Sequence, residues 1–413
     1  MSRGSRMMRA IMRRIVVLPA VLALSLLPAP ILAQEKPPVQ QIERMLQASP
    51  DHRGLWIEMA AAHARAGNDA EALRWIGKAI DRKLDFDLAE NPDLARLLAQ
   101  PEGKALLARA EANRRVVQRG KVAFQVPQKD LIPEGIAHDP KTGDFFVGSI
   151  LQRKIVRIDK AGKASDFTTS GQDGLQGLLG MRVDPATRTL WACSGPSARV
   201  SAEPSLLYRY DLATGALKGK HALPGSPPHL CNDVALGPGG EVFVTDSTGG
   251  AVHRLRPGQE ALENLVPLGT LIYPNGLAIS TDGKRLFVAD FRGLSFVDVA
   301  TGKVEALKPP EPVNVTGVDG LYLHDGHLVA VQNSSGTERV VRFKLNAGQN
   351  AILSEEVLES RNPLFKIPTT GVVSGSSLYL IASSYLDSLD DQGKLKPDAP
   401  LGEVTVLQIP LGG

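Results

Sequence analysis

The chain has 413 residues, of which 43% are hydrophobic and 22% charged, a composition ordinary for a soluble globular protein with room for more than one domain. The formal net charge is +3, and after Arg14 the basic residues form no stripe interleaved with aromatic residues, which argues against nucleic acid as a partner. Forty glycines and 29 prolines are spread along the chain, a pattern typical of many short strands joined by turns.

The first predicted element is an export signal over residues 1–33. Five arginines up to Arg14 precede an apolar stretch that begins at Ile15 and ends at Ala33. A basic region, an apolar region and a final small residue are typical of a cleavable secretory signal. We therefore expect a secreted or periplasmic protein with no membrane attachment after cleavage. An uncleaved membrane anchor is the alternative, although three prolines in the stretch would weaken a spanning helix.

A small α-helical domain is predicted over residues 38–115, because apolar residues recur there with a period of 3.6. The segment from Arg53 to Ile80 resembles a tetratricopeptide repeat, in which two antiparallel helices pack through small residues. His63 and Leu84 depart from that pattern, which usually has an aromatic residue and a proline at these positions. Fewer than two repeats are too few for a solenoid groove, so we expect the helices to pack on the following domain. Docking of a protein partner is the alternative.

Residues 121–413 contain six segments with one pattern: a small polar start, an apolar strand, a turn and a second apolar strand. Their equivalent first positions recur at the length of one four-stranded propeller blade, about 40–50 residues. These positions are Glu134, Leu179, Asn232, Asn275, Asp319 and Thr370. A strand near Lys121 can close the ring with the last strand of the chain. The predicted fold class is therefore mainly β, a six-bladed β-propeller preceded by a small α-helical, tetratricopeptide-like domain.

Two cysteines occur in the chain, Cys193 and Cys231, on neighbouring predicted blades. In an oxidising compartment such a pair is a candidate disulfide. Two separate buried thiols, packed as small hydrophobic side chains, are the alternative.

The first strand of each propeller blade lines the central channel, so the six equivalent positions should converge on one axis. Four of them carry oxygen donors: Glu134, Asn232, Asn275 and Asp319. Two carboxylates and two amides suit a hard cation such as Ca²⁺, and without a cation one carboxylate would have to take up a proton. No Cys/His cluster has the spacing of a zinc site. The alternative is that these side chains only hydrogen-bond water and backbone.

Short motifs at these positions resemble those of the gluconolactonase/regucalcin (senescence marker protein) family. They are Pro133-Glu134-Gly135, Asn232-Asp233-Val234, Pro274-Asn275-Gly276-Leu277 and Val318-Asp319-Gly320. The resemblance covers the whole predicted propeller. It implies that Glu134, Asn275 and Asp319 hold one divalent metal, with Asn232 as a further ligand or as a contact to substrate or a metal-bound water.

The implied chemistry is hydrolysis of a lactone or related ester, with Asp319 as general base and Asn232 at the reacting centre. His229 could act as the base instead, or be an ordinary loop histidine, and Asp233 is expected to orient a ligand from behind it. Leu179 removes a polar group from the second blade, which favours a less polar lactone or an aryl ester. The alternative function is a non-catalytic binding propeller with a structural channel metal and a helical docking repeat.

Overall fold

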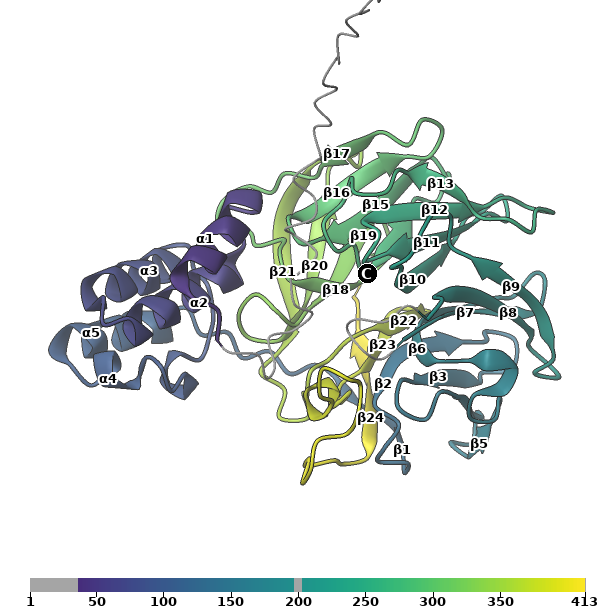
Figure 1. Cartoon of the computed structure of the whole chain (residues 1–413), viewed down its shortest axis with the longest axis horizontal. Helices are drawn as coiled ribbons and strands as arrows, with labels where there is room; N and C mark the ends of the chain where they lie inside the picture. Colours follow the sequence, from purple (N-terminus) through teal and green to yellow (C-terminus); the bar gives the residue numbers. More distant parts are fainter. Residues whose placement is uncertain (1–35, 197–202, 413) are drawn as a thin grey trace, which may run out of the picture.

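A computed structural model describes residues 36–196 and 203–412, and the predicted export signal lies outside the described residues. Within them, a group of α-helices precedes six four-stranded sheets arranged in a ring (Figure 1). The prediction of a mainly β, six-bladed propeller preceded by a few helices is therefore confirmed.

Each blade is a four-stranded sheet, and the first five blades use strands consecutive in the chain. Blades one to three contain β2 (Pro133–His138), β3 (Phe145–Ser149), β4 (Ile155–Ile158) and β5 (Ala164–Asp166); β6 (Gly177–Asp184), β7 (Thr189–Gly195), β8 (Leu206–Asp211) and β9 (Leu217–Ala222); and β10 (Cys231–Leu236), β11 (Val242–Asp246), β12 (Ala251–Leu255) and β13 (Glu263–Val266). Blades four and five contain β14 (Leu277–Ile279), β15 (Arg285–Asp290), β16 (Gly293–Asp298) and β17 (Val304–Ala306); and β18 (Val318–His324), β19 (His327–Gln332), β20 (Arg339–Leu345) and β21 (Ile352–Ser360).

The sixth blade joins the two ends of the propeller. Its strands are β22 (Gly371–Ser374), β23 (Ser377–Ile381), β24 (Val404–Pro410) and β1 (Lys121–Val126). β1 pairs antiparallel with β24, from Lys121 opposite Gln408 to Val126 opposite Val404. The ring therefore closes as the sequence predicts, and the closure leaves no long unpaired edge between the first and last blades.

The core consists of layers between the blades rather than one central mass. Six apolar clusters lie in the described structure of the propeller, one between each pair of neighbouring blades. One example packs Phe287 of blade four against Leu321 and Phe343 of blade five. The strands supply these layers because β-branched and aromatic residues alternate along them and face the neighbouring sheet.

The two cysteines lie in the layer between blades two and three. Cys193 of β7 and Cys231 of β10 form a disulfide across this layer. The alternative of two free thiols, which the sequence left open, does not apply to this structure.

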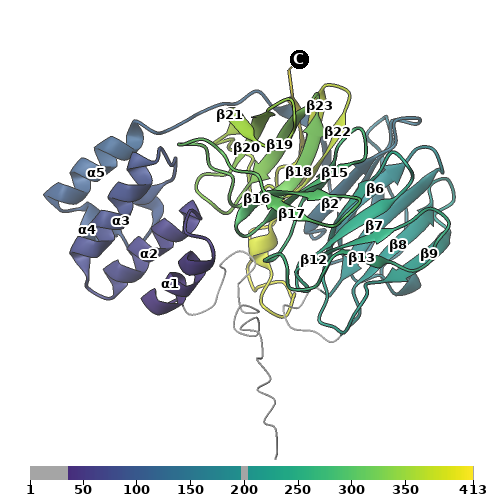
Figure 2. The same ribbon diagram turned by 90° about the horizontal axis from the view of Figure 1, so that it is seen from above.

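The helices form a small domain with its own apolar core at one side of the ring (Figures 1 and 2). They are α1 (Val39–Ala48), α2 (Arg53–Arg65), α3 (Asp69–Asp81), α4 (Ala95–Leu98) and α5 (Pro101–Glu111). α2 and α3 form the antiparallel pair that the repeat-like segment predicts. In the described residues, no helix combines the length and apolar character needed to cross a bilayer.

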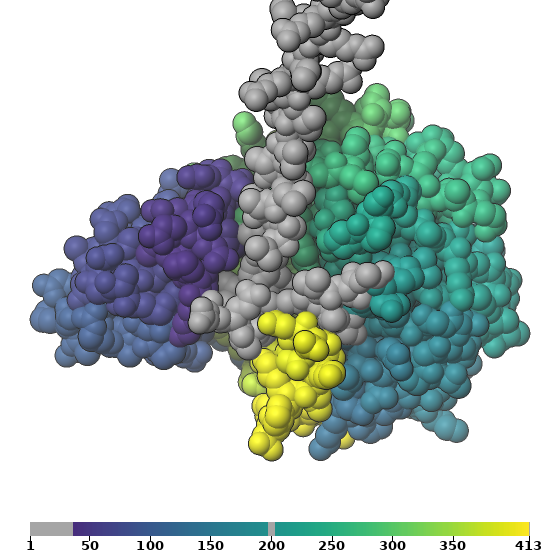
Figure 3. Space-filling model, in the orientation of Figure 1, coloured from purple at the N-terminus to yellow at the C-terminus, as the bar shows by residue number. Residues whose placement is uncertain are grey.

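The helical domain is docked on the propeller through buried polar contacts. The Arg53 guanidinium donates hydrogen bonds to Pro312 O (2.6 Å) and Val313 O (3.1 Å), and its side chain is only 5% exposed. His52 stacks on Phe291 of blade four, with 4.6 Å between ring centroids. The space-filling view shows the helices as a lobe beside the propeller (Figure 3). These contacts agree with the expectation that the helices pack on the propeller.

Candidate active site in the propeller channel

The first strands of the six blades stand next to one another around the central axis. In chain order each of β2, β6, β10, β14, β18 and β22 neighbours the next, and β22 neighbours β2. The end of the channel at which these strands begin is called the mouth below. Because the strands pair antiparallel, as in Pro133 opposite Ser149, the segments that follow each second strand also lie at the mouth.

A break in strand register turns the first channel residue of most blades out of the ladder. The pairing of β2 with β3 shifts between Pro133 and Ile136, so that Glu134 and Gly135 form a bulge. Equivalent shifts occur in blades two, three and five. A bulge re-aims a side chain that would otherwise point into the layer between sheets, and it places these side chains at the channel.

A glycine beside the channel residue allows neighbouring first strands to approach. A Cβ on Gly135 would lie 1.8 Å from Leu179 O, and one on Gly276 would lie 2.3 Å from Asp319 O. Blade three departs from this pattern, because Asp233 takes the place of the glycine. Its side chain lies against Gly180, where a Cβ would come within 2.3 Å of Asp233 Oδ1.

The structure gathers the four predicted oxygen donors at the mouth. Glu134, Asn232 and Asp319 are buried, with exposed fractions of 5%, 4% and 9%, and Asn275 is half-buried. Each has a buried oxygen without a hydrogen-bond partner: Glu134 Oε2, Asn232 Oδ1, Asn275 Oδ1 and Asp319 Oδ1. An unsatisfied buried acceptor is costly, at about 1–3 kcal/mol each. Four such oxygens at one mouth form a donor set that a hard cation can satisfy.

Other side chains hold these donors in place. Asn232 Nδ2 donates to Ser247 Oγ (2.8 Å), and Ser247 Oγ donates to Pro274 O, next to Asn275. Asn333 Nδ2 donates to Asp319 Oδ2 (2.6 Å). These hydrogen bonds use Asn232 Nδ2 and Asp319 Oδ2. Asn232 Oδ1 and Asp319 Oδ1 have no hydrogen-bond partner.

The channel carries an excess of buried negative charge. Burial raises the pKa of Glu134 well above its usual range, and the nearby Asp319 and Asp233 carboxylates raise it further. Burial raises the pKa of Asp319 to about 6, although the Asn333 and Asn275 amides oppose this shift. Arg182 provides a partial balance, with its Nη2 atom 3.6 Å from Asp233 Oδ2. A bound cation would offset both the burial and the mutual repulsion that raise these pKa values.

The residues present therefore fit the divalent metal that the resemblance implies. Glu134, Asn275 and Asp319 offer oxygens only, as does Asn232, and hard cations such as Ca²⁺ prefer oxygen ligands. The evidence for this fit is that each of the four residues has a buried oxygen without a hydrogen-bond partner. This observation does not depend on the family resemblance.

Sequence reasoning did not identify three residues around this site. Arg182, Ser247 and Asn333 come from the interior or the end of strands, where polar residues carry no recognisable motif. Asp233 stands in blade three where the other blades have glycine, and this departure in the sequence pointed to a special role at the position. This carboxylate is buried beside Arg182, and Val234 N donates to its Oδ1 atom (2.8 Å).

Two aromatic side chains near the mouth, one of them the alternative base His229, face other partners. His229 does not join the four oxygen donors, because its Nδ1 atom lies 2.6 Å from Asp246 Oδ2 within blade three. Phe291 is stacked on His52 of the helical domain. Part of the loop after β7 lies outside the described residues.

Comparison with known proteins places the chain in context. The model of the SMP-30/gluconolactonase/LRE-like region matches residues 132–350, more than half of the chain. A comparison with curated proteins found no match.

Three solved propellers are similar in fold. A proposed oxidoreductase (glucose dehydrogenase) from Thermus thermophilus is 18% identical, with a TM-score of 0.50, over 70% of this chain and 99% of its own. A gluconolactonase from Xanthomonas campestris is 15% identical, with a TM-score of 0.48, over 72% and 98%. The PQQ-bound aldose sugar dehydrogenase from Streptomyces coelicolor is 18% identical, with a TM-score of 0.48, over 70% and 98%. At these identities the likeness concerns the fold alone, whereas the family match spans five of the channel positions, and the chain belongs to the SMP-30/gluconolactonase/LRE-like family.

Proposed function

We propose that this protein is an exported, metal-dependent hydrolase that opens a lactone or a related ester at the channel mouth. Membership of a family that includes gluconolactonases supports a lactonase-type reaction at the coarse level. The observation that carries the proposal is the set of four buried oxygens without partners on Glu134, Asn232, Asn275 and Asp319.

In this proposal Glu134, Asn275 and Asp319 hold the cation. When bound, a divalent ion such as Ca²⁺ supplies positive charge that polarises the substrate carbonyl and stabilises negative charge on its oxygen. The raised pKa of Glu134 supports this assignment, because a carboxylate buried beside others needs a positive partner to remain ionised. Asn232 contributes its free oxygen to the same space, either to the ion or to the substrate.

Asp319 is the proposed general base. Asn333 donates a hydrogen bond to its Oδ2 atom and so orients the carboxylate. In the proposal this carboxylate both contacts the cation and takes the proton from the attacking water.

The test is hydrolysis of sugar lactones, aliphatic lactones and aryl esters by protein that starts at Gln34, with added Ca²⁺ and with chelator. We expect turnover that the chelator removes and Ca²⁺ restores. Asp319→Asn should lower kcat/KM by at least about a hundredfold, since removal of a general base typically costs 10²–10⁴ in rate.

Asp325→Asn is the matched control, because Asp325 is an exposed residue in the turn between β18 and β19 of the same blade. Turnover unchanged in Asp319→Asn would remove Asp319 from the mechanism. Absence of turnover with every metal, from folded protein, would contradict the hydrolase and leave a binding propeller.

Export is part of the same proposal. The Cys193–Cys231 disulfide supports it, since disulfides persist in the periplasm and outside the cell and are rare in the cytosol. Mass spectrometry of protein from a periplasmic extract should find a chain that begins at Gln34. Full-length protein confined to the cytosol would contradict export without affecting the hydrolase.

A further inference from the structure

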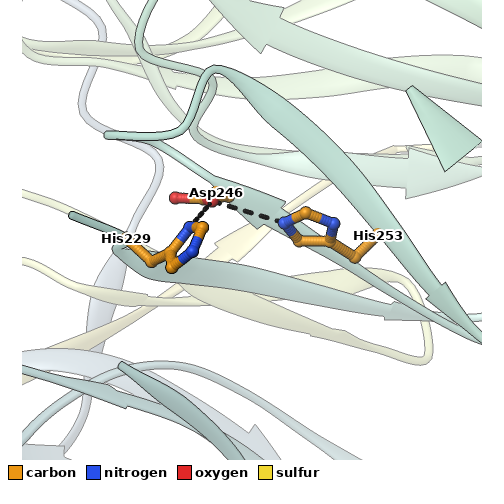
Figure 4. A group of neighbouring side chains, drawn as sticks. All are labelled: His229, Asp246 and His253. Atoms are coloured by element: carbon orange, nitrogen blue, oxygen red, sulfur yellow. Dashed lines mark hydrogen bonds and ion pairs between the residues drawn. The ribbon is translucent and has the colours of Figure 1, made fainter. Parts of the chain in front are cut away.

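Two histidines and an aspartate gather in blade three, outside the set of four channel oxygens (Figure 4). Asp246 Oδ2 lies 2.6 Å from His229 Nδ1 and 3.3 Å from His253 Nε2. One ligand atom from each residue lies within 4.8 Å of the other two. The Asp246 and His253 side chains are fully buried, and the His229 side chain retains 7% exposure.

The fold holds the Asp246 carboxylate rigidly. Asp246 ends β11 and pairs with Cys231 across the ladder. Its Oδ1 atom accepts hydrogen bonds from Leu230 N and Gly249 N, both at 2.9 Å. A Cβ on Gly249 would lie 2.1 Å from Asp246 Oδ2, so the glycine leaves room for this oxygen. The carboxylate therefore presents Oδ2 alone to the two imidazoles.

The hydrogen bonds of His253 leave one of its nitrogens facing an acceptor. In the tautomer in which Nδ1 carries the proton, the ring donates to Asn264 Oδ1 at 2.9 Å. Nε2 then has a free lone pair, 3.3 Å from Asp246 Oδ2. This tautomer leaves a nitrogen ligand beside the carboxylate oxygen and close to His229.

We propose that His229, Asp246 and His253 form a second metal site, for a transition metal of the Zn²⁺ class. Imidazole nitrogens combined with a carboxylate are ligands of Zn²⁺, whereas the oxygens of the channel suit Ca²⁺. Metal-binding histidines usually donate their second ring N–H to a neighbouring acceptor, which fixes the tautomer. In the proposed site Asn264 Oδ1 is this acceptor for His253 Nδ1.

The site would brace one wall of the channel. It ties together the segment that leads into β10, the end of β11 and the middle of β12. Ser247 follows Asp246 in the chain and accepts a hydrogen bond from Asn232. The proposed site is therefore connected to Asn232 at the mouth. The inference does not depend on the hydrolase, since a metal here would support a binding propeller equally well.

The experiment is a titration of the metal-stripped protein that starts at Gln34 with Co²⁺. Visible absorption monitors binding, and metal analysis after gel filtration gives the number of ions bound. We expect one equivalent with the intense d–d bands of a low-symmetry nitrogen and oxygen site. His229→Gln and His253→Gln should each abolish these bands. Asn264→Leu should weaken Co²⁺ binding by about 10–100-fold, as other outer partners do.

Two controls separate this site from the channel. Asp319→Asn should leave the Co²⁺ bands unchanged, and so should His327→Gln, which alters a half-buried histidine at the start of β19. Circular dichroism verifies that each variant is folded, and His229→Gln, at the least buried ligand, is the variant least expected to disturb the blade. Bands that persist in both histidine variants, or a folded wild-type protein that binds no Co²⁺, would overturn the site.

Discussion

At the scale of single residues, the channel brings together buried carboxyl groups that repel one another when they are ionised. Glu134, Asp233 and Asp319 are buried carboxylates, and Arg182 is the cation paired with one of them. This arrangement is unfavourable in the metal-free protein and favourable once a cation is bound. The stability of the metal-free protein should therefore depend on pH through these groups.

The metal-free protein should become less stable as pH rises from about 4 to about 7. The pKa of Asp319 is raised from its ordinary 3.8 to about 6, so between these values the folded protein binds more protons than the unfolded chain. The contribution of Asp319 to stability is complete below about pH 4 and is lost by about pH 6, a change of about 3 kcal/mol. Urea unfolding in chelator at several pH values measures the slope.

Asp319→Asn should remove this part of the slope, and added Ca²⁺ should remove it from the unchanged protein. Asp325→Asn, at an exposed turn, should keep it. The same slope in the wild-type protein and in Asp319→Asn would show that Asp319 does not titrate in this range.

Replacement of Asn333 by leucine should weaken Ca²⁺ binding without removing a proposed ligand. Asn333 donates to Asp319 Oδ2 and to Pro368 O, and so orients the carboxylate. Loss of such an outer partner typically lowers metal affinity by about 10–100-fold. Calorimetric titration with Ca²⁺ measures the change. Asn350→Leu, in an exposed turn, is the control, and equal affinities for the two variants would contradict the orienting role.

At the scale of elements, the ring depends on close contact between neighbouring first strands. Gly276 N donates to Asp319 O at 2.9 Å, across the boundary between blades four and five. The proximity of these backbones sets the diameter of the channel and therefore the spacing of the oxygen donors.

Gly276→Ala should destabilise the propeller by about 1–3 kcal/mol, the usual effect of overpacking. The added Cβ would lie 2.3 Å from Asp319 O, which is backbone and cannot rotate away. Gly77→Ala is the matched control, because nothing lies within 4 Å of that Cβ in α3, and alanine there should stabilise the helix by about 0.5–1 kcal/mol. Urea unfolding compares the two, and a Gly276→Ala variant as stable as the wild type would show that the strands can separate without loss.

At the scale of the whole molecule, the helical domain and the propeller act as one body through contacts at the mouth. The α2 N-terminus touches the segment that follows β19, since a Cβ on Gly54 would lie 2.6 Å from Ser334 O. Ser334 follows Asn333, which holds Asp319. The docking of the helices and the geometry of the candidate base are therefore connected through one short segment. Binding of a protein partner by the helices remains a prediction.

Arg53→Met should loosen the helical domain from the propeller. Arg53 donates to Arg82 O, Pro312 O and Val313 O, and each buried carbonyl that loses its donor costs about 1–3 kcal/mol. Limited proteolysis should cut the segment between α5 and β1 faster in this variant. Arg74→Met, which removes a pair with Glu71 from a side chain that is 57% exposed, should leave the cleavage rate unchanged. Equal rates in both variants would contradict docking through Arg53.

The sequence by itself determined the blade repeat, the closure by β1 and β24, and the four oxygen donors, because a repeated strand pattern places equivalent residues at equivalent positions. Only the tertiary structure decided that Cys193 meets Cys231, that Asn333 and Ser247 position the donors, and that Arg53 joins the two domains. It also brought His229, Asp246 and His253 together through the register of three strands. These contacts join residues with no local pattern in common, so their proximity depends on how the strands pair and how the blades pack.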